Sequence, residues 1–220
     1  MNVSTILFDA YGTLFDLQSA LEPAAARLGD RAQIVFDRWR TLQLDYAWLS
    51  ALRNERLPFE VCTRRAYADA LAAAGVEDDG LVDMLSEGFR SVRAYADASG
   101  CLEALREAGH QTAILTNGDL EMVTAASEAA GLAPLLDEVI SVEPSGTYKP
   151  APDAYAVGLA FSKRAARDTL FVSSNWWDVA GAASFGYRVA HVARPGSFWP
   201  RSEDAPKIVV DSLVDLLPEV

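Results

Sequence analysis

The sequence predicts an α/β protein: a doubly wound, Rossmann-like parallel sheet with an inserted helical cap domain. From about residue 98 onward, short apolar runs of strand length alternate with helical segments that end at glycine, which is typical of a parallel sheet covered on both faces. Ahead of this region, a single apolar run is followed by helical periodicity from Leu17 to Tyr95 with no strand pattern. We therefore expect a core domain over residues 1–14 and 98–220 and a helical cap domain over residues 15–97.

The N-terminal segment predicts a buried strand that leads into a turn. The apolar run Val3 to Phe8 ends abruptly at Asp9, and Tyr11-Gly12-Thr13 follows. In the cap segment, apolar residues spaced three to four apart between Phe36 and Leu49 predict a long helix, and the alanine-rich stretch 59–74 predicts another.

The remaining elements are expected in alternation along the core segment. We expect strands at 112–115, 138–142, 170–172, 189–192 and 208–210, with helices at 102–108, 120–130, after Pro152 and at 178–185.

Composition limits the possible functions. The chain has 220 residues, enough for one catalytic unit with a sizeable core. Its formal charge of −12 disfavours nucleic acid and anionic membrane surfaces as partners. No stretch approaches the roughly 20 apolar residues of a membrane span, and the first apolar run is too short for a signal peptide. We expect a cytoplasmic protein in which Cys62 and Cys101 are buried thiols, because their contexts do not suggest a disulfide or a metal site.

Polar side chains follow four of the predicted strands. Asp9 ends the first strand and Thr116-Asn117-Gly118 the next; Lys149 follows the third, and Ser173-Ser174-Asn175 ends the fourth, with Asp178 close behind. Each taken alone is explained by helix capping, a turn or a solvated charge. Their recurrence at four successive strand ends predicts a catalytic site, because the carboxyl ends of parallel strands share one edge of the sheet.

Four ordered segments resemble the motifs of the haloacid dehalogenase superfamily. They are Asp9-Ala10-Tyr11-Gly12-Thr13-Leu14-Phe15-Asp16, Leu115-Thr116-Asn117-Gly118, Tyr148-Lys149-Pro150 and Phe171-Val172-Ser173-Ser174-Asn175-Trp176-Trp177-Asp178. Within that superfamily the segments most resemble the L-2-haloacid dehalogenases. The resemblance implies hydrolysis of short L-2-haloacids or haloacetates to 2-hydroxyacids with inversion, without metal or other cofactor, in a homodimer formed through the cap.

The resemblance also implies a role for each site residue. Asp9 forms an ester with the substrate, Lys149 holds and orients that ester, and Asp178, with Ser173 and Asn175, positions the hydrolytic water. The other catalytic residues implied are Arg40 and Thr13, and the other substrate-binding residues are Tyr11, Thr116, Asn117, Trp177 and Tyr155, with Arg40 again.

Some of these residues have more specific expected contacts. Thr116, with backbone amides after Asp9, would bind the substrate carboxylate, and Arg40 in the cap would meet the halogen or the carboxylate. Asn117 and Trp177 would complete the halide pocket, and Tyr155 would support the site near Lys149.

Two residues depart from the family pattern. Thr116 stands where serine is usual, and Trp176 adds a second bulky aromatic side chain where a small residue is commoner. Both changes affect the expected volume of the pocket.

A phosphatase that acts on small phosphate esters with Mg²⁺ is the alternative within the superfamily. That chemistry needs a second aspartate two residues after the nucleophile, and carboxylates near the last motif to hold the metal. Position 11 is Tyr, and Asp178 is the only carboxylate of the last motif. The sequence therefore favours the dehalogenase.

Other classes have less support. His110 and His191 accompany no Gly-x-Ser-x-Gly elbow of a serine hydrolase and are expected at a strand edge or the surface. The first strand is not followed by Gly-x-Gly-x-x-Gly, as a dinucleotide-binding oxidoreductase would require. A binding protein without catalysis would be expected to have lost Asp9, Lys149 or Asp178, and all three are present.

Overall fold

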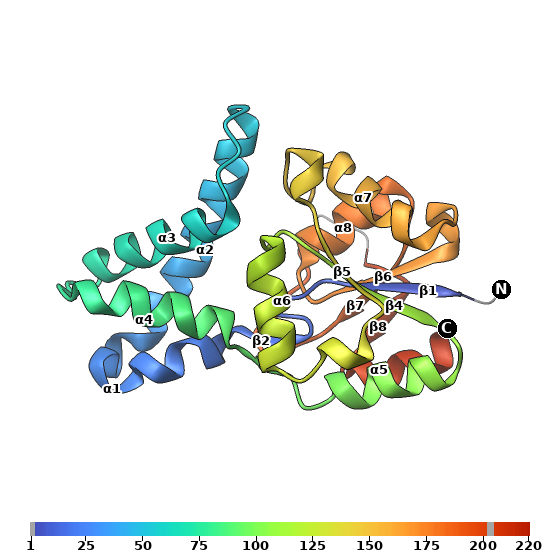
Figure 1. The fold of residues 1–220 in the computed structure, drawn as a ribbon, viewed down its shortest axis with the longest axis horizontal. Coiled ribbons are helices and arrows are strands. Elements are labelled where there is room, and N and C mark those ends of the chain that lie inside the picture. The colour runs from blue at the N-terminus through green and yellow to red at the C-terminus, as the bar shows by residue number, and fades with distance from the viewer. Residues whose placement is uncertain (1–2, 202–204) are drawn as a thin grey trace.

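A six-stranded parallel sheet forms the centre of the molecule, with helices on both faces (Figure 1). The computed structural model describes residues 3–201 and 205–220. The strand order is β5-β4-β1-β6-β7-β8. Helices α7 and α8 cover one face, and α5 lies against the other. The predicted fold class is therefore confirmed.

The elements alternate along the core segment as predicted, with boundaries that shift by a few residues at most. The strands of the main sheet are β1 (Thr5–Phe8), β4 (Gln111–Thr116), β5 (Glu138–Ser141), β6 (Thr169–Ser173), β7 (Arg188–Val192) and β8 (Ile208–Val210). The helices around it are α5 (Ala98–Glu107), α6 (Leu120–Ala129), α7 (Pro152–Ser162) and α8 (Trp176–Phe185).

A group of helices stands off one end of the sheet, at the left of Figure 1. It contains α1 (Ala25–Leu28), α2 (Ala32–Leu52), α3 (Phe59–Ala73) and α4 (Asp79–Arg90). A 3₁₀ segment over Leu17–Ala24 packs against α4. We call this group the cap.

The expectation that residues 17–95 contain no strand was wrong. Strand β3 (Arg93–Ala94) pairs antiparallel with β2 (Phe15–Asp16), so the chain enters and leaves the cap through one small two-stranded sheet. Strands of two residues carry no readable alternation of side chains, and their pairing joins segments far apart in sequence.

Strand β1 lies at the point where the order of the strands reverses: β4 and β5 follow it on one side of the sheet, and β6, β7 and β8 on the other. It pairs with β4 on one side and with β6 on the other, in parallel register. In such sheets ligands bind beside the carboxyl ends of the strands at this switch point. Asp9 follows β1 directly and is therefore placed at the expected binding edge.

The core is apolar, as the strand sequences predict. All four residues of β1 and all five of β6 are buried, because helices cover both faces of the sheet. Cys62 and Cys101 are both free and buried, as expected. Within residues 3–201 and 205–220, no helix is both long enough and apolar enough to cross a membrane.

The placement expected for His191 was wrong. It lies on β7, between β6 and β8, and is 4% exposed, with Nε2 3.1 Å from the carbonyl oxygen of Ser174. A polar residue in a short strand does not show whether that strand lies at the edge or in the interior of the sheet.

Candidate active site

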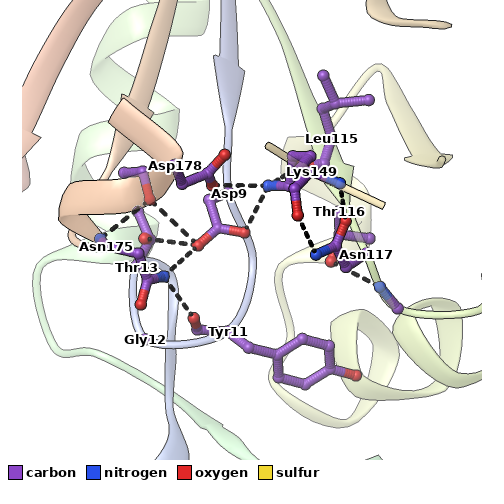
Figure 2. Close-up of polar contacts among 12 residues, drawn as sticks. Asp9, Tyr11, Gly12, Thr13, Leu115, Thr116, Asn117, Lys149, Asn175 and Asp178 are labelled. Atoms are coloured by element: carbon purple, nitrogen blue, oxygen red, sulfur yellow. Dashed lines mark hydrogen bonds and ion pairs between the residues drawn. The ribbon is translucent and has the colours of Figure 1, made fainter. Parts of the chain in front are cut away.

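The carboxylate of Asp9 is buried and held by donors from several parts of the core (Figure 2). Its Oδ1 accepts a hydrogen bond from Lys149 Nζ at 2.9 Å. Its Oδ2 accepts from Asn175 Nδ2 at 2.8 Å, from Thr13 Oγ1 at 3.2 Å and from Ser173 Oγ at 3.3 Å. One oxygen is thus fixed by three side chains, while the other meets only the lysine side chain.

Lys149 lies between two carboxylates. Its Nζ donates to Asp9 Oδ1, to Asp178 Oδ2 at 2.7 Å and to the carbonyl oxygen of Leu115 at 2.9 Å. These three bonds use all three ammonium protons, and the side chain is fully buried. Burial opposes the charged form, but the adjacent Asp178 and Asp9 outweigh it and raise the pKa of Lys149. The lysine therefore remains a cation that compensates both carboxylates.

Asp178 lies behind this lysine with no solvent exposure. Its Oδ1 accepts a hydrogen bond from the Tyr155 hydroxyl at 2.8 Å. Burial raises the pKa of Asp178 to about 6, against the lowering effect of Lys149 and of the tyrosine hydrogen bond. A carboxylate with this pKa can take up a proton near neutral pH, as a general base must.

The backbone of Lys149 is fixed from both domains. Asn117 Oδ1 accepts from its backbone N–H at 2.8 Å, and Asn117 Nδ2 donates to its carbonyl oxygen at 3.3 Å. Trp48 Nε1, on α2 of the cap, donates to the same oxygen at 2.8 Å. Asn117 therefore positions the lysine as well as facing the cavity described next.

A small cavity lies over Asp9, between the core and the cap. Its volume is about 10 Å³, which is room for about one water. Its lining residues are Asp9, Tyr11, Arg40, Leu44, Phe59, Thr116, Asn117, Asn175 and Trp177. A haloacid is larger than one water, so binding it requires movement of the cavity walls.

A wider cleft of about 720 Å³ lies outside this cavity. The two share Arg40, Leu44, Asn175 and Trp177, which therefore form the partition between them. The ring of Trp177 packs edge-on against Trp48 of the cap, with 5.3 Å between centroids.

Arg40 reaches the cavity from α2 and is oriented by a buried chain of hydrogen bonds. Its Nη1 donates to Gln43 Oε1 at 2.7 Å, and Gln43 Nε2 donates to Thr63 Oγ1 at 2.7 Å. Thr63 Oγ1 donates to the carbonyl oxygen of Phe59 at 2.8 Å. Burial lowers the pKa of Arg40, and the charge of Asp9 partly offsets this effect. Arginine nevertheless stays protonated in proteins, so the cavity holds a cation opposite Asp9.

Every site residue expected from the sequence lies at this site. Asp9, Thr13, Lys149, Tyr155, Ser173, Asn175 and Asp178 form one hydrogen-bonded network, and Tyr11, Arg40, Thr116, Asn117 and Trp177 line the cavity. Asp178 and Ser173 lie behind the cavity and do not line it. Tyr155 lies near Lys149 and contacts the site through Asp178, which accepts from its hydroxyl and from the lysine.

Sequence reasoning missed three cap residues at the site: Leu44, Phe59 and Trp48. Each occupies an apolar position of helical spacing, where a core role is the ordinary interpretation. Trp176 lines the outer cleft, not the inner cavity, and its ring lies 6.3 Å from that of Phe198. It therefore does not reduce the volume directly over Asp9.

The arrangement suits nucleophilic catalysis by a carboxylate. Asp9 is desolvated, fixed in orientation and adjacent to a cavity that contains a cation. The ammonium of Lys149 lies between the two carboxylates and compensates their charge. In the part of the chain that the structure describes, no three His, Cys, Asp or Glu side chains are grouped to hold a metal ion.

The fold and the site define an α/β protein with a helical cap and a buried aspartate that is placed to act as a nucleophile. Comparison with known proteins agrees: the model of the haloacid dehalogenase-like hydrolases matches residues 3–186. The chain belongs to this family.

Several characterised relatives are dehalogenases. The chain is 38% identical to (S)-2-haloacid dehalogenase 4A of Burkholderia cepacia over 96% of its length and 92% of the relative's. It is 32% identical to haloacetate dehalogenase H-2 of Moraxella sp. (strain B), with 98% of each chain covered.

A solved structure has the same fold. The L-2-haloacid dehalogenase of Xanthobacter autotrophicus with chloropropionic acid covalently bound superposes with a TM-score of 0.90 at 34% identity. The match covers 98% of this chain and 97% of that one.

Proposed function

We propose that this protein is an (S)-2-haloacid dehalogenase that converts short L-2-haloacids, or haloacetates, to 2-hydroxyacids. The observation that carries the proposal is the carboxylate of Asp9, which is buried, paired with Lys149 and opposite Arg40 in a small cavity. Halide departs without a proton, so the reaction needs no acid where Tyr11 stands. The named relatives and the structure with covalently bound chloropropionic acid support this function.

In the first step, Asp9 attacks the halogen-bearing carbon C2. A bond forms between an Asp9 oxygen and C2 while the carbon–halogen bond breaks, and the halide leaves with the bonding pair. Oδ1 is the better placed oxygen, because Thr13, Ser173 and Asn175 hold Oδ2. Attack from the side opposite the halogen inverts C2.

In the second step, water attacks the carbonyl carbon of the Asp9 ester. Asp178 takes one proton from this water, and the bond between the Asp9 carbon and the ester oxygen breaks. The departing alkoxide takes the remaining proton of the added hydroxyl and leaves as the 2-hydroxyacid, so that Asp9 is again a carboxylate and Asp178 then gives up its proton to solvent. The water must approach on the side where Lys149 and Asp178 lie, because Asp178 is behind the cavity. The C2–O bond is not touched, so the inverted configuration is kept.

The remaining cavity residues bind the substrate in this scheme. Arg40 contacts the halogen or the carboxylate, Thr116 the carboxylate, and Asn117 with Trp177 the halide. Asn117 also holds Lys149, so its two roles are coupled. Ser173 and Asn175 orient Asp9 directly, and Asn175 additionally faces the substrate.

Halide release from L-2-chloropropionate tests the proposal, with EDTA present and the D-enantiomer in parallel. We expect release from the L-enantiomer alone, with D-lactate as the product. A single turnover in ¹⁸O-labelled water should give unlabelled product and label on Asp9, because the product oxygen comes from the carboxylate. Failure to release halide from either enantiomer, together with Mg²⁺-dependent hydrolysis of a phosphate ester, would overturn the proposal in favour of the phosphatase.

We also propose a homodimer, a cytoplasmic location and a cap domain bounded at residues 15 and 97. Exposed apolar side chains on α2 support the dimer: Ile34 is 61%, Leu49 54% and Leu52 82% exposed. The pairing of β2 with β3 near residues 15 and 94 supports the domain division. Light scattering after size exclusion measures the assembly.

A further inference from the structure

The first turn of α3 has no side-chain cap from its own segment. Pro58 precedes the helix and can offer no such bond, so the first N–H groups need another acceptor. Asp119 of the core supplies it: its Oδ1 accepts from the N–H of Phe59 at 2.9 Å and its Oδ2 from the N–H of Glu60 at 2.8 Å. One carboxylate thus caps a cap-domain helix from about sixty residues away, where a negative charge also favours the helix dipole.

Asp119 would ordinarily cap its own helix. It precedes α6 with an extended backbone, the usual geometry of an N-terminal capping residue, yet makes no such bond. Glu143 accepts from the N–H of Leu120 at 3.0 Å in its place. The Asp119 side chain is therefore directed away from its own element and across to the cap.

The turn that Asp119 holds carries a wall of the catalytic cavity. Phe59 is 2% exposed and lines that cavity, although Asp119 itself does not. The carbonyl oxygen of Phe59 also accepts the bond from Thr63 that leads through Gln43 to Arg40. The first turn of α3 therefore bonds to the core through two N–H groups, and it bonds through the carbonyl oxygen of Phe59 to the chain of side chains that orients Arg40.

We propose that Asp119 is a positioning residue that fixes Phe59 over Asp9 and so limits the length of the substrate side chain at C2. This inference rests on the proposed dehalogenase function. Asp119 lies two residues after Asn117, which holds Lys149, so one short loop sets both the lysine and the opposite wall. Without the carboxylate, the first turn of α3 loses two acceptors and Phe59 can withdraw from the cavity.

Two variants and a matched control test the role. Asp119→Ala removes both acceptors, and Asp119→Asn keeps one. Glu143→Ala removes a comparable carboxylate bond to the first turn of α6 and leaves α3 untouched. The readouts are kcat and KM for L-2-chloropropionate and L-2-chlorohexanoate, and hydrogen exchange at the amides of Phe59 and Glu60.

We expect Asp119→Ala to shift the ratio of kcat/KM by about tenfold toward the longer substrate, since even one methylene in a hydrophobic pocket is worth at least that much. Asp119→Asn should give a smaller shift and Glu143→Ala none. Exchange should accelerate at both Phe59 and Glu60 in Asp119→Ala, at one of the two in Asp119→Asn and at neither in Glu143→Ala.

Unchanged exchange in Asp119→Ala, or faster exchange with an unchanged substrate ratio, would overturn the positioning role. Absence of halide release by the wild-type protein would instead overturn the proposed function. The exchange measurement separates the two, because it needs no substrate.

Discussion

The core side and the cap side of the cavity differ in the kinds of side chain that form them. On the core side, Asp9, Lys149 and Asp178 are joined by short hydrogen bonds, and the lysine uses every donor. On the cap side, Leu44 and Phe59 line the cavity with apolar side chains, and Arg40 reaches it with its guanidinium held by Gln43. The core side is a polar network, whereas the cap side is mostly a shaped apolar surface.

This difference assigns separate tasks to the two sides. A network of charges with all its bonds made fixes the position of the nucleophile before substrate arrives, which lowers the cost of reaching the transition state. An apolar wall distinguishes substrates by their size, and one methylene more or less on the substrate changes its binding only moderately. Changes on the core side should therefore affect the rate most, and changes on the cap side should affect selectivity.

The largest effect is expected for Asp9→Asn. An amide is a far weaker nucleophile than a carboxylate, so kcat for halide release should fall by at least about 10⁴-fold. Mass spectrometry of the protein after incubation with L-2-chloropropionate should show no added ester.

Asp137→Asn is the matched control for this change. Asp137 accepts a hydrogen bond from the N–H of Thr112 at 2.9 Å, at the opposite end of the sheet from Asp9. That variant should retain wild-type turnover. Turnover by Asp9→Asn close to the wild-type rate, or ester formation on it, would contradict the assignment of the nucleophile.

An intermediate effect is expected for the acid limb of the pH profile. Burial raises the pKa of Asp178 to about 6, and only the ionised form can accept a proton from water. In the ester Asp9 carries no charge and no longer raises this pKa, so the rate of ester hydrolysis should fall about tenfold per pH unit below a pKa that is lower than in the free protein. Tyr155→Phe removes a hydrogen bond that favours the ionised form, so the limb should move up by about one pH unit.

Tyr187→Phe controls for the loss of a buried hydroxyl nearby. Tyr187 donates to the carbonyl oxygen of Tyr155 at 2.8 Å and does not contact Asp178. The limb should stay in place in this variant. If Tyr155→Phe leaves the midpoint of the acid limb unchanged, or moves it to lower pH, Asp178 is not the base.

The smallest effect is expected for Leu44→Ala. Leu44 lines the cavity from α2, so its truncation enlarges the space beside Arg40. We expect KM for L-2-chloropropionate to rise by about tenfold or less, with kcat nearly unchanged. Leu49→Ala, on an exposed position of the same helix, should change neither constant. A large loss of kcat in Leu44→Ala would mean that the cap takes part in positioning the nucleophile.

Sequence predicted the core side of this site far better than the cap side. The strand ends could be located because buried parallel strands are continuous apolar runs, and polar residues such as Asp9 and Asn175 interrupt them. Phe59 and Leu44 carry no such mark, because an apolar helical residue looks the same whether it faces a helix or a substrate. The carboxylate of Asp119 was equally unmarked, because its partners, two backbone N–H groups and the side chain of Arg56, are about sixty residues away in the cap.

The contact made by Tyr155 is a detail of the site that the sequence did not specify. The resemblance implied only that Tyr155 supports the site near Lys149, and the structure shows that its hydroxyl bonds to Asp178, which Lys149 also contacts. The direction of a side chain depends on tertiary packing. Tyr155 lies on α7, which packs against α8, the helix that carries Asp178. Such contacts require coordinates.

The central position of β1 has a consequence for biosynthesis. Its strand neighbours begin at Gln111 and Thr169, and Asp9 meets Lys149 across 140 positions of sequence. A ribosome therefore delivers Asp9 long before Lys149. One edge of β1 stays open until β4 is made, and the other stays open until β6 is made. Closing loops this long is slow, so the nascent chain has greatest need of chaperone protection before β4 and β6 are made.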